Sequence, residues 1–475
     1  MKFQRAVGLI IIGSAVAGAA LMLFAVAWTD PLMAEPPEHT LISDTWNVFY
    51  DDSVPPLRIL IFAVGLGLAL AALVALAERR ISLRSRRSMM PDVLPLAPRV
   101  IMAKTRGVFA GPVTITVLVP AHNEEAAIGA TIDSLKAQSF PPSRIVVVAD
   151  NCTDATVEIA RGRGVDVLET VDNSHKKAGG LNQALRQVLP GQGDNDLVMV
   201  MDADTTLDAG FLEIVATRMT DDRALMAVGG LFYGEDGGGL IGQMQRNEYH
   251  RYGRELRRRR GRVYVLTGTA TVFRPIALRT VAASRGGTLP GVPGDVYDTL
   301  ALTEDNELTL ALKSLGAQMV SPHQCTVVTE VMPSWRALWA QRLRWQRGAL
   351  DNLGAYGLTP QTMRYWAQQL GIGYGVLALT SYLLLMALMM LSMDSWVWFP
   401  FWLGIGLLFV LERVVTVWRG GWRARLLALT LFPELAYAMF LNIVYVRGVM
   451  DIALGREAAW KHIVQADDGT VKVED

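Results

Sequence analysis

Two aspartates separated by one residue, Asp202 and Asp204, directly follow an apolar run over residues 197–201. Two carboxylates at this spacing, at the end of a strand, can hold a divalent cation that in turn binds a diphosphate. The pair alone is a weak signal, because Asp-x-Asp occurs by chance in many chains. The sequence contains no GxxxxGK[ST] motif and therefore does not support a P-loop nucleotide hydrolase.

Two more polar clusters follow apolar, β-branched runs. Asn123 and Glu124 come after residues 113–119, and Asp150 follows residues 144–149. Any one of these clusters could be no more than the N-cap of a helix. Three clusters, each at the end of a predicted strand, instead indicate one site at one edge of a sheet.

Further candidate residues lie at the starts of predicted helices. Lys177 precedes two glycines, which suits a phosphate-binding turn, although a lysine in such a loop is as often simply solvated. Glu304 and Asp305 open a helix predicted over residues 306–315, where the helix dipole alone would favour acids. These residues become a functional set only if the fold brings them to the strand ends.

An amphipathic stretch over residues 334–350 combines tryptophans with arginines and contains Gln341, Arg344 and Trp345. Its simplest interpretation is a helix lying on a membrane surface. That interpretation is compatible with a catalytic role for part of the same helix.

The scaffold for these residues is predicted from the alternation of strands and helices over residues 110–350. Buried strands are expected at 113–119, 144–149 and 197–201, and helices at 124–137, 154–162 and 178–189. This alternation predicts a mostly parallel, doubly wound α/β sheet. In such sheets ligands bind beyond the carboxyl ends of the strands, where the polar clusters lie.

The composition requires a second kind of structure. The chain of 475 residues is 51% hydrophobic and 19% charged, whereas a soluble domain carries roughly 25% charged residues. Its 45 basic and 45 acidic residues still need water, so we expect membrane spans combined with a globular domain. The chain has only two cysteines, which argues against a disulfide framework and against a cysteine metal site. Its six histidines show no paired spacing, which argues against a histidine metal site.

Two N-terminal spans are predicted, because residues 6–28 and 59–77 are uncharged and long enough to cross the hydrocarbon core. The loop over residues 29–56 contains acids but no lysine or arginine, whereas arginines follow the second span. The positive-inside rule therefore places this loop outside and the rest of the chain in the cytoplasm. A cleaved signal peptide is the weaker alternative, because the first apolar run is too long.

Hydrophobic segments return at residues 370–391, 396–411 and 426–446. Pro433 and Glu434 interrupt the last of these. If it crosses the membrane fully, the tail lies outside; if it is re-entrant or interfacial, the tail lies inside. An acid at mid-membrane depth indicates function by default, and a proline-kinked helix with Glu434 facing other helices is an equally good interpretation.

Taken together, four motifs resemble the D, DxD, TED and QxxRW signature of membrane-embedded family 2 glycosyltransferases. They are Asp150, Asp202-Ala203-Asp204, Thr303-Glu304-Asp305 and Gln341-x-x-Arg344-Trp345. This group is similar to the processive synthases of cellulose, hyaluronan, chitin oligosaccharide and poly-N-acetylglucosamine. The resemblance implies a cytoplasmic α/β catalytic domain of the GT-A type, inserted between α-helical transmembrane segments of a cell-membrane protein, and a UDP-sugar donor.

The resemblance also implies a role for each residue. The residues implied to bind the donor are Asn123, Glu124, Asp150, Lys177, Asp202, Gln341 and Arg344. Asp204, helped by Asp202, would bind Mg²⁺ or Mn²⁺, and Asp305, beside Glu304, would be the catalytic base. Trp345, Gly268 and Thr269 would contact the acceptor. One base acting in a direct displacement inverts the anomeric centre.

The match has departures. The usual Asp-Asp pair before Gly-Ser is here Ala149-Asp150 before Asn151-Cys152, which loosens the assignment of Asp150. Thr267 stands where some relatives have cysteine.

The resemblance leaves three functions to be compared. The first is a processive enzyme that polymerises sugars and passes the glycan through its own spans. The second transfers one sugar to a membrane lipid, and the third is a transporter with an inactive sugar-binding domain, against which the intact set of acids argues. Nothing indicates a nucleic-acid partner: the arginines at 257–260 are most simply a solvated patch or one that faces lipid headgroups.

The expected organisation has six parts. They are two spans and their external loop over residues 1–80, a basic cytoplasmic linker over 81–110, the GT-A domain over 111–332, an interfacial region over 333–364, a region of two or three spans over 365–446, and a tail over 447–475.

Overall fold

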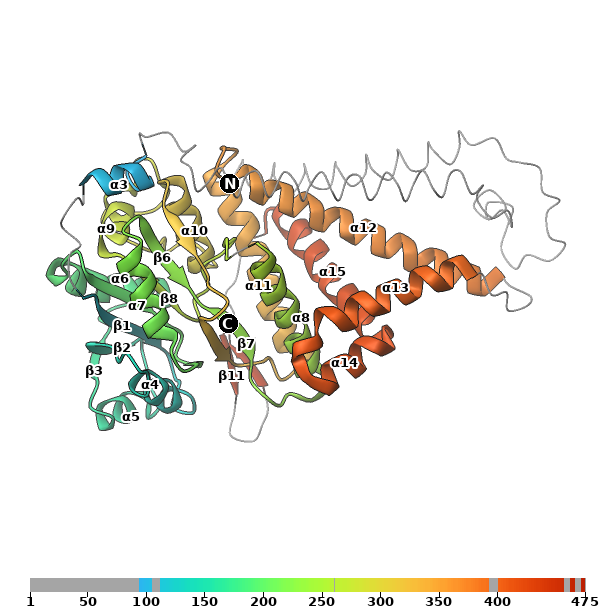
Figure 1. The fold of residues 1–475 in the computed structure, drawn as a ribbon, viewed down its shortest axis with the longest axis horizontal. Coiled ribbons are helices and arrows are strands. Elements are labelled where there is room, and N and C mark those ends of the chain that lie inside the picture. Colours follow the sequence, from blue (N-terminus) through green and yellow to red (C-terminus); the bar gives the residue numbers. More distant parts are fainter. Residues whose placement is uncertain are drawn as a thin grey trace.

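The computed structural model describes residues 94–104, 112–259, 261–392, 400–456, 462–465 and 471–474. The two predicted N-terminal spans, their external loop and most of the basic linker lie outside the described residues. The first described helix is the short α3 (Pro98–Lys104), which precedes the main sheet in the chain (Figure 1).

A seven-stranded sheet is the centre of the α/β part, in the order β3-β2-β1-β4-β8-β6-β9. Its strands are β1 (Thr114–Ala121), β2 (Arg144–Ala149), β3 (Asp166–Glu169), β4 (Asp196–Val200), β6 (Leu225–Gly229), β8 (Thr271–Phe273) and β9 (Gln318–Val320). β1, β2, β3 and β4 run parallel, as do β6 and β9, and β8 is antiparallel to both β4 and β6. The predicted mostly parallel sheet is therefore confirmed, with one reversed strand.

Helices cover both faces of this sheet. They are α4 (Ile128–Lys136), α5 (Thr156–Gly162), α6 (Lys176–Val188), α7 (Phe211–Asp221), α9 (Pro275–Ser284) and α10 (Glu304–Ser314). A smaller sheet has the order β5-β10-β7, formed by β5 (Thr205–Leu207), β10 (Thr326–Thr329) and β7 (Leu231–Gly234). The helix predicted from residue 124 starts only at Ile128, because residues 122–127 form the turn that follows β1.

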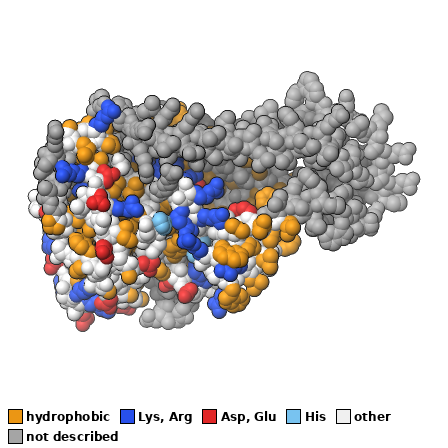
Figure 2. Space-filling view, in the orientation of Figure 1, with side chains coloured by type: hydrophobic (Ala, Val, Ile, Leu, Met, Phe, Trp, Pro, Cys, Tyr) orange, Lys and Arg blue, Asp and Glu red, His pale blue; other side chains and the backbone are white. Residues whose placement is uncertain are grey.

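The remaining helices form the other half of the molecule (Figure 1). They are α8 (Gly239–Arg258), α11 (Trp335–Tyr356), α12 (Met363–Ser392), α13 (Pro400–Thr416), the 3₁₀ turn η2 (Trp418–Gly420), α14 (Gly421–Thr430) and α15 (Phe432–Ala453). α12 and α13 extend away from the sheet, and hydrophobic side chains gather on the surface over α14 (Figure 2). Among the described helices, α15 alone has both the length and the apolar composition to cross a membrane.

The predicted segment over 426–446 is not one helix. α14 ends at Thr430, Leu431 adopts a left-handed backbone with φ of 55°, and α15 begins at Phe432. Pro433 lies in the first turn of α15, where its missing N–H costs nothing. The proline therefore starts a helix instead of kinking one, which corrects the interpretation from the sequence.

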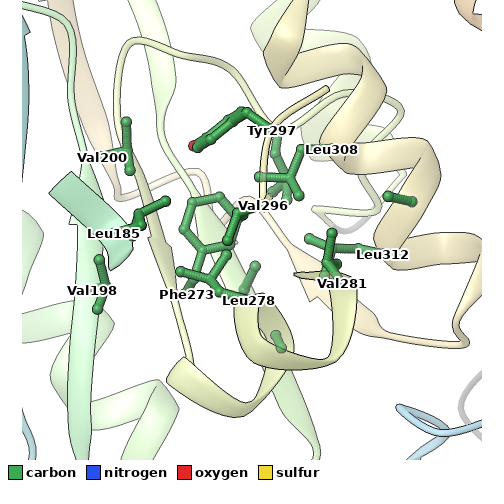
Figure 3. Packing of buried hydrophobic residues seen from close by; sticks show 14 of the residues in the cluster. Leu185, Val198, Val200, Phe273, Leu278, Val281, Val296, Tyr297, Leu308 and Leu312 are labelled. Carbon is green, nitrogen blue, oxygen red and sulfur yellow. The ribbon is translucent and has the colours of Figure 1, made fainter. Parts of the chain in front are cut away.

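The sheet is apolar on both faces, which explains the buried runs in the sequence. In β1, Ile115, Val117 and Val119 pack towards α4 and α7, whereas Leu118 packs on the opposite face. On that opposite face, Phe273 of β8 packs with α6, α9 and α10, as Figure 3 shows. Because successive side chains of a strand alternate, a two-sided core needs near-continuous apolar strands.

A buried ion pair anchors α10 within this core. Arg285 Nη1 lies 2.5 Å from Glu307 Oε1, and Arg285 Nη2 donates to Glu307 Oε2 at 2.7 Å. The hydroxyl of Tyr356, at the end of α11, donates to the same carboxylate. Glu307 thus connects the loop after α9 to α11 through the helix that begins with Glu304 and Asp305.

We predict that Glu307→Ala lowers the free energy of unfolding by about 3–5 kcal/mol, because it leaves a buried guanidinium without its counter-charge. Chemical denaturation of the purified chain in detergent measures this change. The control is Arg144→Ala, which breaks the exposed Arg144–Asp166 pair and should cost about 0–1 kcal/mol. Equal losses in the two variants would contradict the prediction.

Candidate active site

A half-buried lysine joins the aspartate at the end of β4 to the first residue of α10. Lys177 Nζ lies 2.5 Å from Asp202 Oδ1 and 2.7 Å from Glu304 Oε1. Burial acts to lower the pKa of Lys177, but the two carboxylates outweigh it and hold this pKa well above its usual value. Burial likewise acts to raise the pKa of Glu304, and Lys177 reverses the effect, so that this pKa lies below its ordinary value. Lys177 is therefore charged and fixed in place.

Asp204 lies outside this ion pair. Its Oδ1 accepts a hydrogen bond from Thr205 Oγ1 at 3.0 Å, and burial followed by the charge of Asp202 raises its pKa to about 6. Burial and then Asp204 raise the pKa of Glu124, after β1, to about 8. The ends of β1 and β4 thus bring two predicted carboxylates close enough to disfavour each other's charge.

Glu330 is a further carboxylate at this place, and the sequence analysis missed it. β10 pairs antiparallel with β5, with Thr329 opposite Thr205, so that Glu330 follows the strand beside Asp204. Burial, and then the charges of Asp204 and Glu235, raise the pKa of Glu330 to about 7. The rule that located the other acids, an acid directly after a strand, applies to Glu330 only once β10 is known to be a strand.

These acids suit a divalent cation that arrives with a diphosphate. Among the residues that the structure describes, no three histidine, cysteine or acidic side chains are placed to hold a metal ion by themselves. Mg²⁺ is usually bound through one or two carboxylates together with substrate phosphates. Asp204 matches that donor set, because it is a half-buried carboxylate whose neighbours are mainly negative and whose lysine neighbour is engaged by Asp202 and Glu304.

Asp305 follows Glu304 in α10 and has hydrogen-bond partners of its own. Its Oδ2 accepts a hydrogen bond from the Gly268 backbone N–H at 3.1 Å, and its Oδ1 accepts one from Asn306 at 2.7 Å. Burial and then Glu304 raise the pKa of Asp305 to about 6. A buried carboxylate with a pKa near the working pH can act as a general base.

The loop around Gly268 fits closely between these groups. A Cβ at Gly268 would lie 2.9 Å from Lys177 Nζ and 3.2 Å from Asp202 Oδ2, so only glycine allows this approach. The hydroxyls of Thr267 and Thr269 lie 2.8 Å apart. The structure therefore places Gly268 against Asp305, and Thr269 follows in the same loop.

Polar side chains form a hydrogen-bonded cluster at the end of β2. Asp150 Oδ1 accepts hydrogen bonds from Thr170 Oγ1 and Asn173 Nδ2, both at 2.8 Å. Asn123 Oδ1, after β1, accepts from the Thr153 backbone N–H at 2.8 Å. Because β1 and β2 are parallel neighbours, these two predicted residues lie at the same sheet edge as Glu124.

The helix α11 brings one of the QxxRW residues, Arg344, near this edge. Arg344 lowers the pKa of Glu304, as Lys177 does, but to a smaller extent. The charge of Arg344 therefore lies near the Lys177 ion pair. Gln341 Oε1 is buried and has no hydrogen-bond partner. The contact made by Trp345 is with Arg342, whose guanidinium lies 4.4 Å from the centre of the indole ring.

Arg342 is a second residue that the motif spacing did not indicate. It is buried, and its Nη2 donates to Glu248 Oε2 of α8 at 2.9 Å. The same carboxylate oxygen accepts from Tyr437 of α15 at 2.6 Å. Arg342 therefore fixes the ring of Trp345 and connects it to the C-terminal helices.

Comparison with known proteins gives this arrangement a family. The profile described as "Glycosyltransferase like family 2" matches residues 112–348. "Probable glycosyltransferase YdaM" of Bacillus subtilis is 28% identical over 244 residues, which cover 49% of this chain and 54% of that protein. The "Poly-beta-1,6-N-acetyl-D-glucosamine synthase" of Staphylococcus epidermidis is 23% identical over 246 residues, covering 50% and 55%. The chain thus spans about half the length of these curated relatives.

Two further likenesses concern a shorter segment and a solved structure. A "4,4'-diaponeurosporenoate glycosyltransferase" of Staphylococcus aureus is 34% identical over 118 residues, covering 24% of this chain and 31% of that protein. Among solved structures, a mannosyltransferase from Pyrobaculum calidifontis in complex with GDP-Man and Mn²⁺ has a TM-score of 0.46 and 16% identity, covering 83% of this chain and 99% of that one. The family match spans the sheet, its strand-end acids and α11 as far as Gly348, so these residues form a family 2 glycosyltransferase domain with the GT-A fold.

Proposed function

We propose that this protein is an inverting glycosyltransferase that moves a sugar from a UDP-sugar to a growing glycan and exports the product through its own membrane helices. The observation that carries the proposal is the Lys177 ion pair, which joins Asp202 to Glu304, while Asp305 beside it accepts from Gly268 instead. Transfer needs a base at the acceptor hydroxyl and positive charge at the leaving diphosphate. Asp305 supplies the base, and Lys177 supplies positive charge.

Asp305 takes the proton from the acceptor hydroxyl as that hydroxyl attacks the anomeric carbon. Its Gly268 hydrogen bond holds one carboxylate oxygen in place, so the carboxylate is oriented before substrate binds. Attack from the face opposite the leaving UDP inverts the anomeric centre. Gly268 and Thr269 then line the acceptor end, and Trp345 stacks on an acceptor sugar.

The donor side is assigned to the other residues of the set. Asn123, Glu124 and Asp150 hold the uridine, and Lys177, Gln341 and Arg344 lie at the diphosphate. Asp204 holds the cation, Mg²⁺ or Mn²⁺, which when bound stabilises the charge that develops on UDP. Because Asp202 Oδ1 is engaged by Lys177, we assign Asp202 chiefly to orienting that lysine, with at most a share of the metal.

We place the domain on the cytoplasmic side of the cell membrane, with α12 and α13 as spans. Although α15 has the length and apolar composition to cross a membrane, we expect it to stay on that side, because its two ends meet α8 and α11. Glu434 at its start accepts from Asn247 of α8 at 2.9 Å, and the Arg456 carbonyl beyond its end accepts from Arg347 of α11. This supports the re-entrant or interfacial alternative, with the tail inside.

A second candidate function is transfer of one sugar to a lipid acceptor. The observation that favours it is the 34% identity to a relative named for 4,4'-diaponeurosporenoate. The two functions are separated by giving the purified enzyme in liposomes several radiolabelled UDP-sugars. A polymer that resists lipid extraction supports the first function, and a single extractable glycolipid supports the second.

We predict that Asp305→Asn lowers the transfer rate by about 10²–10⁴-fold, because the acceptor hydroxyl loses its base. UDP binding, measured by calorimetry, should remain nearly intact, since Asp305 is assigned to the acceptor. The matched control is Asp221→Asn, at the exposed end of α7. Normal turnover by Asp305→Asn would contradict the assignment.

The pKa of Asp305, about 6, predicts an acid limb in the rate. The base must be deprotonated, so kcat should fall tenfold per pH unit as the pH drops below about 6 and should level off above it. The measurement is kcat against pH at saturating donor and Mg²⁺, which keeps Asp204 and Glu124 in their bound state. A kcat that stays constant down to pH 5 would overturn the role of Asp305.

We predict that Gly268→Ala lowers activity by about 10–100-fold while leaving the melting temperature nearly unchanged. The added methyl displaces the flexible end of Lys177, and small displacements in a site are costly to rate. Gly162→Ala is the control, because nothing lies within 4 Å of a Cβ there. Equal activity of the two variants would show that the position of Lys177 does not matter.

A further inference from the structure

One surface of the molecule has no role in the proposed catalysis. It is formed by the C-terminal end of α8 together with η2 and α14. We call it the basic–aromatic face, and it consists of Arg257, Arg258, Arg419, Arg423, Trp418 and Trp422. Figure 2 shows basic side chains over the end of α8 beside the hydrophobic ones over α14. It includes part of the arginine run that the sequence left as a solvated or headgroup-facing patch.

The three elements form one continuous surface. η2 and α14 both pack on α8, and a Cβ at Gly420 would lie 2.8 Å from the His250 ring. Burial raises the pKa of Tyr233 in β7, while Arg257 and Arg419 both act to lower it. These two arginines, from α8 and η2, therefore flank the same tyrosine.

Arginines on α8 recur at helical spacing and divide into two kinds. Arg251 pairs with the buried Glu434, and Arg254 donates to the Val415 carbonyl, so these two dock α8 on the C-terminal helices. Arg257 and Arg258 continue the same stripe beyond the docked region. Among the residues that the structure describes, neither they nor Arg419 and Arg423 are paired with a carboxylate. Their charge is left for something outside the described chain.

The helix α14 is apolar on two sides. Ala424 and Ala428 are buried against the protein, while Trp422, Leu426 and Leu429 face outward and are 67%, 52% and 58% exposed. Trp418, just before α14, is 55% exposed, and the Arg425 guanidinium lies 4.2 Å from its ring centre. An outward apolar stripe flanked by tryptophan and arginine is typical of a helix lying in a membrane surface.

We propose that the basic–aromatic face binds the anionic headgroups of a lipid bilayer, with α14 lying in the plane of the membrane surface. The sign of the charge selects anionic over zwitterionic lipid, since four arginines gather there and the exposed acid of the same part of α8, Glu255, is paired with Arg259. The outward tryptophans and leucines select a bilayer over a free phosphate, because only a bilayer covers apolar side chains while its phosphates meet the arginines. This proposal does not depend on the sugar chemistry.

The depth of α14 is tested first, in the full chain reconstituted into nanodiscs of phosphatidylcholine with phosphatidylglycerol. A fluorophore at Leu429→Cys, in a Cys152→Ser background, should be quenched strongly by lipids brominated near the headgroup. The control probe is at Val171→Cys, which is exposed on the catalytic domain and should not be quenched. Equal quenching at the two sites would overturn the in-plane placement of α14.

The charge selection is tested by replacing Arg257, Arg258, Arg419 and Arg423 together with glutamine. Native mass spectrometry of the detergent-purified chain should show several-fold preference for phosphatidylglycerol over phosphatidylcholine, and the fourfold variant should lose it. The control variant, Arg144→Gln with Arg161→Gln, removes exposed arginines from the far end of the catalytic domain and should retain the preference.

Two further arms separate other anions. Inorganic phosphate should not displace phosphatidylglycerol. The chain should also show no binding of a DNA oligonucleotide that the fourfold variant loses. Unchanged lipid preference in the fourfold variant, or displacement by phosphate alone, would overturn the proposal. Transfer activity in pure phosphatidylcholine should be equal in all variants, which verifies that each one is folded.

Discussion

The contact of Lys177 with two acids sets the geometry on which the rest of the site depends. A buried charge is tolerated only when it is well paired, so Lys177 needs both Asp202 at the end of β4 and Glu304 at the start of α10. This fixes how close a strand end and a helix from different parts of the chain must lie. Asp305, the next residue of α10, is thereby placed beside the loop that contains Gly268. The ion pair thus fixes the proposed base relative to the end of β4.

The helix α11 serves two parts of the molecule with different faces. Arg344 lies near the ion pair, whereas Trp335 and Trp339 contact Phe440 of α15 with ring centres 5.0 and 5.8 Å apart. The interfacial and the catalytic interpretations of this stretch are therefore compatible, because they concern opposite sides of one helix. An amphipathic pattern with both tryptophan and arginine is what such a shared helix requires.

Much of the sheet and of its acidic edge could be predicted from the sequence, because continuous apolar strands and the polar residues after them are local signals. β2 lies where it was expected, over Arg144–Ala149, and Asp150 follows it. Glu330 was missed because β10 is a short strand without an apolar run, and it meets Asp204 only through pairing with the distant β5. Arg342 was missed because its burial depends on α8 and α15. The break at Leu431 was missed because hydrophobicity continues across it while the backbone turns.

Glu434 shows how a charge that looks expensive in a membrane segment is accommodated. Its carboxylate is paired with Arg251, accepts from Asn247, and lies 3.8 Å from Arg413, so protein groups replace water around it. An acid satisfied in this way belongs to the contact between α8 and α15, and it needs no role in moving a substrate. One turn later on the same helix, Tyr437 donates to Glu248, which holds Arg342 against Trp345. A displacement of the start of α15 would therefore strain the Glu434 ion pair and the support of Trp345 together. The C-terminal helices and the proposed acceptor side are mechanically one unit.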